Sequence, residues 1–146
     1  MSTEVRQALV DSPQTVFQAE SQRTDLLDPT ITQTGLIALL SELVAKGHVL
    51  LFTAIKSDHH DDSALGLHCH FNGYCADLWP MHSAAPTDYI DAADPAFAVF
   101  LADVASSAYL YQVGLAGTAW TSSNAVAAGG SVFHDDGADH VHLGAS

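Results

Sequence analysis

The chain has 146 residues, of which 48% are hydrophobic and 14% are charged, which is the composition of a globular protein and not of a disordered one. Its 17 acidic residues outnumber its 4 lysine and arginine residues and give a formal net charge of −13. A surface of that sign repels phosphate groups, which argues against binding to nucleic acids and to anionic membranes.

The first 25 residues are polar, and we expect residues 1–25 to form an N-terminal arm with one short helix, ahead of a single domain at 26–146. This segment lacks the basic and apolar regions of a secretory signal, so we expect no signal peptide. No apolar run in the chain reaches the roughly 18 residues that a membrane-spanning helix needs, so we expect no membrane partner.

Two segments carry the signals of helices. Asp28-Pro29 is typical of a helix start, apolar residues then recur at helical spacing through 29–46, and Gly47 is typical of a helix end. Asp94-Pro95 opens a second helix, in which apolar side chains again share one face. We therefore predict one helix over 29–46 and another that begins at residue 95.

Short apolar or alternating segments predict strands at 48–55, 67–79, 109–115 and 140–143. The second of these is interrupted by Asn72-Gly73, a turn signal. Residues 116–138 are rich in small residues and indicate a long functional loop. The resulting order of elements, α-β-β-α-β-β, favours the α+β class, with a small antiparallel sheet and helices packed on one side of it.

Eight of the nine histidines fall in two regions of the chain. The first region holds His59, His60, His68, His70 and His82, and the second holds His134, His140 and His142. Each region also contains several aspartates. Imidazole and carboxylate are ligands that a catalytic zinc ion prefers, and three of them leave a fourth position open.

Spacing narrows the choice of ligands. Residues two apart in a strand share a face, so the histidines of each His-x-His pair project together. A turn at Asn72-Gly73 would bring Asp77 back beside His70. The candidate ligands are His70, Asp77 and one of His140 or His142.

Neighbouring residues allow other interpretations. The run at 59–62 reads His-His-Asp-Asp, which fits a solvated acidic loop and also resembles the His-Asp pairs of metal-dependent phosphohydrolases. The anionic substrates of those enzymes favour basic residues, which are scarce here. Cys69 and Cys75 are expected to be two small, partly buried thiols, although a disulfide between them is also compatible with the spacing.

The stretch from His70 through Gly73 to Asp77 resembles the first motif of the zinc D-alanyl-D-alanine carboxypeptidases and dipeptidases, which are related to the hedgehog-like and lysostaphin-like metallopeptidases. That motif is a histidine, a glycine three residues later and an aspartate seven residues after the histidine. The second motif, an acidic residue three positions before the last metal histidine, resembles Asp139 and His142. The resemblance extends over residues 26–144, and its specificity lies in the two motifs.

The resemblance implies a Zn²⁺ site in a cleft on the sheet. Its metal ligands would be His70, Asp77 and His142. Asp139 would be the general base that takes a proton from the attacking water, and His140 would donate a hydrogen bond to the developing oxyanion. Lys56 lies where the family usually carries an arginine that grips the carboxylate of the substrate. A lysine supplies a point charge and not a bidentate fork, so this is a departure from the family pattern.

The function implied by the resemblance is a hydrolase, a zinc metallopeptidase that cuts peptidoglycan stem peptides or other D-Ala-containing peptides as a carboxypeptidase or endopeptidase. We expect it to be made in the cytoplasm and to act in cell wall degradation after lysis, as a phage lysin, or from a virion. In the virion case the N-terminal arm would contact other virion proteins. The alternative hypothesis is a peptidase-fold module without activity that serves as a structural component of a phage particle.

Overall fold

The computed structural model describes residues 3–56, 72–85, 87–115, 132–135 and 141–145. Its helices are α1 (Thr3–Asp11), α2 (Glu20–Leu27), α3 (Thr34–Ala45) and α4 (Pro95–Ala105). Its strands are β1 (Thr15–Phe17), β2 (Val49–Ala54), β3 (Cys75–Met81), β4 (Leu110–Leu115), β5 (Val132–Asp135) and β6 (Val141–Ala145). Within these described ranges, no helix combines the length and the hydropathy that crossing a membrane requires.

The strands form one open sheet in the order β1-β2-β3-β6-β4-β5. The four central strands β2, β3, β6 and β4 are each antiparallel to the next, whereas at the edges β1 runs parallel to β2 and β5 runs parallel to β4. The α+β class is therefore confirmed, but the sheet is mixed and not antiparallel throughout, since both edge pairs are parallel. A parallel pair needs a crossover connection, and the long segment between β1 and β2, which contains α2 and α3, provides one at that edge.

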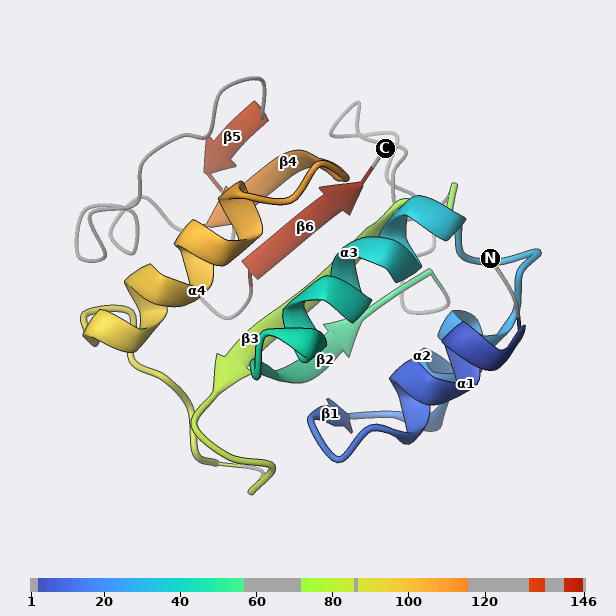
Figure 1. Ribbon diagram of the computed structural model, residues 1–146, viewed down its shortest axis with the longest axis horizontal. Coiled ribbons are helices and arrows are strands. Elements are labelled where there is room, and N and C mark those ends of the chain that lie inside the picture. Colours follow the sequence, from blue (N-terminus) through green and yellow to red (C-terminus); the bar gives the residue numbers. More distant parts are fainter. Residues whose placement is uncertain (1–2, 57–71, 86, 116–131, 136–140, 146) are drawn as a thin grey trace.

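Helices α3 and α4 lie on the same face of the sheet (Figure 1). Alternate residues of the central strands turn toward them. The buried core joins leucines of α3 and phenylalanines of α4 to Phe52, Leu78, Val141 and Leu143. Because successive strand residues point to opposite faces, the residues between these core positions belong to the other face of the sheet. That second face receives Asp77 and His142.

The predicted helix over 29–46 begins later than expected, at Thr34. Asp28 forms a turn instead of a helix cap, because its side chain accepts hydrogen bonds from the backbone N–H and the hydroxyl of Thr30 at 2.8 and 2.6 Å. The other expected ends agree with the structure. Gly47 follows α3 with a φ of 93°, and the Asp94 side chain caps α4 by accepting from the backbone N–H of Ala96 at 2.9 Å.

The segment expected to be an N-terminal arm is part of the packed fold. Residues 3–25 form α1, β1 and most of α2, and Leu9 and Val10 lie in the core. The guanidinium of Arg6 is buried and donates to the carbonyl oxygen of Leu26 at 2.8 Å and to the hydroxyl and carbonyl oxygens of Thr32 at 2.7 and 2.6 Å. Burial lowers the pKa of Arg6. The polar composition of this segment is therefore compatible with packing, because several of its polar groups form hydrogen bonds within the fold.

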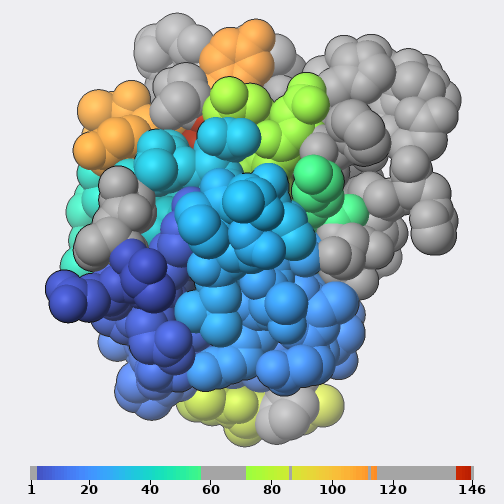
Figure 2. Space-filling view, turned by 90° about the vertical axis from the view of Figure 1, so that its right-hand side faces the viewer, coloured from blue at the N-terminus to red at the C-terminus, as the bar shows by residue number. Residues whose placement is uncertain are grey.

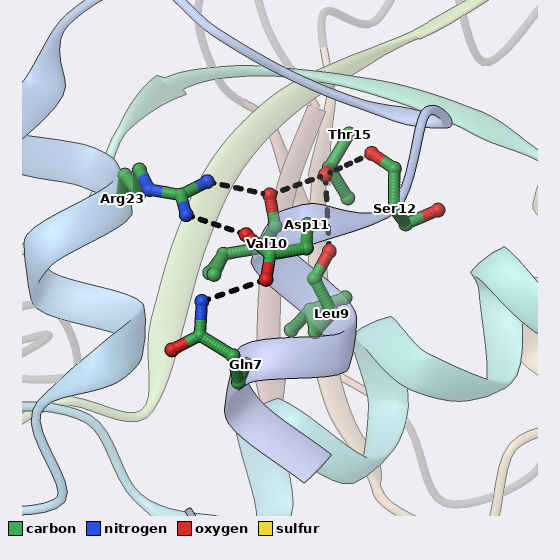
Figure 3. A network of polar contacts seen from close by, with 7 residues as sticks. All are labelled: Gln7, Leu9, Val10, Asp11, Ser12, Thr15 and Arg23. Atoms are coloured by element: carbon green, nitrogen blue, oxygen red, sulfur yellow. Dashed lines mark hydrogen bonds and ion pairs between the residues drawn. The ribbon is translucent and has the colours of Figure 1, made fainter. Parts of the chain in front are cut away.

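A polar network ties α1 to α2 and to β1 (Figure 3). Arg23 pairs with the carboxylate of Asp11 and donates to the carbonyl oxygen of Val10 at 2.8 Å, and Gln7 donates to the same carboxylate at 2.8 Å. The Thr15 hydroxyl donates to the carbonyl oxygen of Leu9 at 3.0 Å. In Figure 2 the dark blue surface of α1 lies directly beside the lighter blue surface of the segment that follows.

The Asp11 contacts predict a loss of stability in acid. Hydrogen bonds from Arg23 and Gln7 hold the pKa of Asp11 below its ordinary value. The folded state therefore gains stability from this carboxylate above the unfolded pKa of about 3.9, and loses it as the pH falls through the lower folded value. Urea unfolding between pH 2 and 7 should show a shallower acid dependence in Asp11→Asn than in the wild type. Arg23→Gln should give a similarly shallow curve, and an unchanged acid limb in both variants would contradict this role.

Candidate metal centre and adjoining cleft

Asp77 and His142 lie side by side on neighbouring strands. Their Cα positions are paired in the antiparallel register of β3 and β6. His142 Nδ1 lies 3.0 Å from Asp77 Oδ1, and the two side chains are only 5% and 7% exposed. The structure thus brings together two of the three expected metal ligands, from positions 65 residues apart in the chain.

Among the described residues, the register shows which histidine lies opposite Asp77. Either His140 or His142 could be the partner of Asp77 by sequence alone. The pairing of β3 with β6 sets His142 opposite Asp77, between Val141 and Leu143, which face the core. His140 lies outside the described residues.

The turn before β3 helps to fix the position of that strand and of Asp77 on it. Asn72 and Gly73 form the expected turn, and Gly73 has a φ of 79°. The backbone N–H of Gln33 donates to the carbonyl oxygen of Gly73 at 2.9 Å, and the Gln33 side chain donates to that of Asn72 at 3.2 Å. A Cβ at Gly73 would lie 2.0 Å from the carbonyl oxygen of Ile31. Only glycine fits this approach, so the start of β3 is held against the loop before α3.

The Asp77–His142 pair has the donor chemistry of a zinc site. One carboxylate and one imidazole are both zinc ligands, and in a tetrahedral site with bonds of about 2.0 Å two donor atoms are about 3.3 Å apart. The observed separation of 3.0 Å is close to that value and is equally that of a hydrogen bond between the two groups. The donor types and separation of these two residues therefore suit a zinc ion, and equally suit a direct hydrogen bond without a metal.

The other expected site residues are placed only in part. His70, Asp139 and His140 lie outside the described residues, as does the run at 59–62. Among the residues that the structure does describe, no three His, Cys, Asp or Glu side chains gather closely enough to hold a metal ion. The third ligand expected beside Asp77 and His142 is His70.

Lys56, the expected substrate-gripping cation, follows β2 and is half-buried. It is not among the described residues that line the cleft beside Asp77. Hydrogen bonds from the Thr30 hydroxyl and backbone N–H are the main reason that the pKa of Asp28 is lowered, and the positive charge of Lys56 adds a smaller contribution. The structure therefore relates Lys56 to the turn before α3, a relation that the sequence does not reveal.

A cleft of about 690 Å³ opens beside Asp77. Its described lining residues are Gln18, Leu51, Thr53, Ala54, Asp77, Trp79, Tyr89, Ile90, Asp91 and Ala92. The segment after β3 supplies one wall by folding back along that strand, since the backbone N–H of Ile90 donates to the carbonyl oxygen of Pro80 at 3.1 Å. Sequence reasoning missed this wall, because nothing in the composition of residues 82–94 marks it as part of a site.

Trp79 is held rigidly at the cleft. Its indole N–H donates to the carbonyl oxygen of Ile90 at 2.9 Å, and its ring lies 5.2 Å from that of Phe97, centroid to centroid. Trp79 thus lines the cleft and also packs against the core. A fixed aromatic surface of this kind is suited to orienting a bound group.

Cys75, at the start of β3, is buried and disulfide-bonded. The expectation of two thiols is therefore wrong for this residue. Sequence spacing cannot establish a disulfide, because the bond depends on the separation and direction of the two Cβ atoms in the folded chain. Cys69, the other cysteine of the sequence, lies outside the described residues.

A second His–Asp pair lies away from the cleft. His48 Nε2 is 2.6 Å from Asp103 Oδ2, and the Phe100 ring meets the imidazole edge-on. Lys46 lies 3.8 Å from the same carboxylate and donates to the Ser106 hydroxyl at 2.9 Å. This pair joins the end of α3 to α4. His48 is the histidine that falls outside both clusters in the sequence, so no pattern pointed to it.

Comparisons with known proteins add no relative. A scan against protein-family models, a search of curated proteins and a search of solved structures each gave no match. The candidate site is therefore supported by the chain's own residues: a buried carboxylate and imidazole, paired across two strands, beside a cleft.

Proposed function

We propose that this protein is a zinc-dependent peptidase that hydrolyses peptide bonds in the D-Ala-containing stem peptides of the bacterial cell wall. The observation that carries the proposal is the contact between Asp77 and His142, two ligands expected from separate motifs, at the edge of a cleft. The choice of cell-wall peptides as substrates comes from the resemblance of those motifs to the D-alanyl-D-alanine peptidases.

In this proposal His70, Asp77 and His142 would hold the metal. When bound, zinc would acidify a water molecule and polarise the scissile carbonyl group. Asp139 accepts the proton of the attacking water and returns it to the leaving amine, and His140 donates a hydrogen bond to the oxyanion.

The sheet supports this chemistry by fixing its residues. Asp77 and His142 lie within the backbone ladder of β3 and β6, and β2 and β4 flank these two strands. Ligands on paired strands hold their separation without the entropy cost of ordering a loop. The neighbouring cleft, with Trp79 in its wall, provides room for a peptide beside the two ligands.

Metal content and peptide cleavage test the proposal together. We expect about one zinc per chain by elemental analysis after dialysis, and release of amino acids or peptides from synthetic stem peptides and from purified peptidoglycan. In Asp139→Ala the zinc should remain while turnover falls by about 10²–10⁴-fold, the usual contribution of a general base.

Two results would overturn this assignment. Zinc bound without cleavage of any stem peptide would favour a module that keeps the fold without the activity. Two metal ions per chain with phosphate ester hydrolysis would favour a phosphohydrolase.

A further inference from the structure

The charges that the structure places in the cleft are negative. Asp91, a described lining residue, supplies the negative charge that the cleft offers to a ligand, because Asp77 contacts His142 and would hold the metal in the proposed function; no lysine or arginine is among the described residues that line the cleft. Asp91 is an exposed residue whose carboxylate accepts from the backbone N–H of Ala93 at 2.9 Å, which holds it in a defined position at the wall. The cleft therefore favours a cationic group over an anionic one.

The positions of the basic residues strengthen this conclusion, because the whole chain has only four, all within described segments. Arg6 is buried between α1 and the α2–α3 turn, Arg23 pairs with Asp11, and Lys46 contacts Asp103 and Ser106. Lys56 follows β2 and is not among the described residues that line the cleft. The segments that the structure does not describe contain aspartates and histidines but no lysine or arginine, so they bring no such cation to the cleft.

The walls of the cleft add a second feature that suits a cation. Trp79 is fixed by its hydrogen bond to Ile90, and Tyr89, two residues before Asp91, is 49% exposed. Both aromatic residues line the cleft together with Asp91. An ammonium group near an aromatic face and a carboxylate gains from cation–π attraction and from a charge-assisted hydrogen bond.

We infer that the cleft beside Asp77 binds a peptide segment through a primary ammonium group, which lies between Asp91 and the aromatic walls. This inference rests on the proposed function and names the feature by which that peptidase selects its substrate. Recognition then depends on an amine of the peptide, and a free C-terminal carboxylate is not the principal anchor. Such an enzyme does not depend on a free C-terminal carboxylate next to the bond that it cuts.

Matched peptides test the amine directly. The parent probe is a synthetic stem pentapeptide ending in L-Lys-D-Ala-D-Ala. Three derivatives accompany it: one is acetylated on the lysine side chain, one is acetylated on the N-terminus, and one carries a C-terminal amide. Binding to the EDTA-treated full chain is measured by calorimetry, and KM and kcat are measured with the zinc-loaded chain. We expect one of the two acetylations to weaken binding and raise KM by roughly tenfold, which identifies the amine, and amidation to change them less than twofold.

The variant Asp91→Asn should reduce that tenfold ratio between free and acetylated peptides to about one. Glu4→Gln removes the same charge from a separate groove between α1 and α3, and it should keep the tenfold ratio. Discrimination in calorimetry without any cleavage would uphold the inference and reject the peptidase. Cleavage with equal constants for free and acetylated peptides, or with the main loss on C-terminal amidation, would reject the inference and leave the peptidase standing.

Discussion

An Asp77→Asn variant should lose its zinc and its peptidase activity together. Loss of a residue that merely supports a metal ligand weakens metal affinity by about 10–100-fold, so loss of the ligand itself should raise the zinc dissociation constant by more than about 100-fold. The asparagine side chain keeps the size of the aspartate but not its charge, so the packing between β3 and β6 is preserved. Zinc titration followed by calorimetry, with turnover of a stem peptide, measures both effects.

The chain offers a matched control for that variant. Asp103→Asn removes the carboxylate of the other His–Asp pair, which joins α3 to α4 through His48. It should bind zinc like the wild type, with a modest loss of stability from the broken pair. Equal zinc affinity in the wild type and Asp77→Asn would show that Asp77 serves only as a hydrogen-bond partner of His142, and the metal site would then have to be abandoned.

Gly73→Ala should destabilise the protein by at least about 3 kcal/mol. A side chain at φ 79° costs about 1–2 kcal/mol by itself. The new Cβ would in addition lie 2.0 Å from the carbonyl oxygen of Ile31 and 3.0 Å from Cα of Thr32, and these backbone atoms cannot move without displacing the loop before α3. Thermal or urea unfolding followed by circular dichroism measures the loss.

Gly47→Ala separates the two causes. Gly47 has a φ of 93°, but a Cβ there would meet nothing within 4 Å. It should therefore cost only the conformational part, about 1–2 kcal/mol. Equal losses at the two glycines would show that the approach of Gly73 to Ile31 is relaxed in solution. The Asn72–Gly73 turn leads directly into β3, which carries Asp77. Gly73→Ala should therefore also weaken zinc binding, and Gly47→Ala should not.

The sequence alone predicted the elements whose signals are local. The apolar run at 48–55 became β2, and Asp94-Pro95 opened α4 with its phenylalanines in the core. Period and cap residues act over a few positions, so they can be recognised without knowing the partners. Asp28-Pro29 misled for the same reason, since a short polar side chain before proline suits a turn as well as a helix start.

For the candidate site, the sequence indicated which residue types could bind a metal, and the tertiary structure showed which of them lie next to each other. Spacing left His140 and His142 open and the motif resemblance named His142, and the register of β3 against β6 places His142 beside Asp77. Asp91 and Tyr89 could not be found in advance, because their place at the cleft depends on a loop that folds back along β3.

The edges of the sheet and the use of buried polar groups were also decided by the tertiary structure. Val132–Asp135 reads as part of a loop and becomes β5 by pairing with β4, and β1 likewise exists because β2 lies beside it. The sequence fully determined the charge, the scarcity of cations and the local periodicity, because these properties need no partner. Strand order, register and the burial of Arg6 depend on which distant segments meet, and that is settled only when the chain packs as a whole.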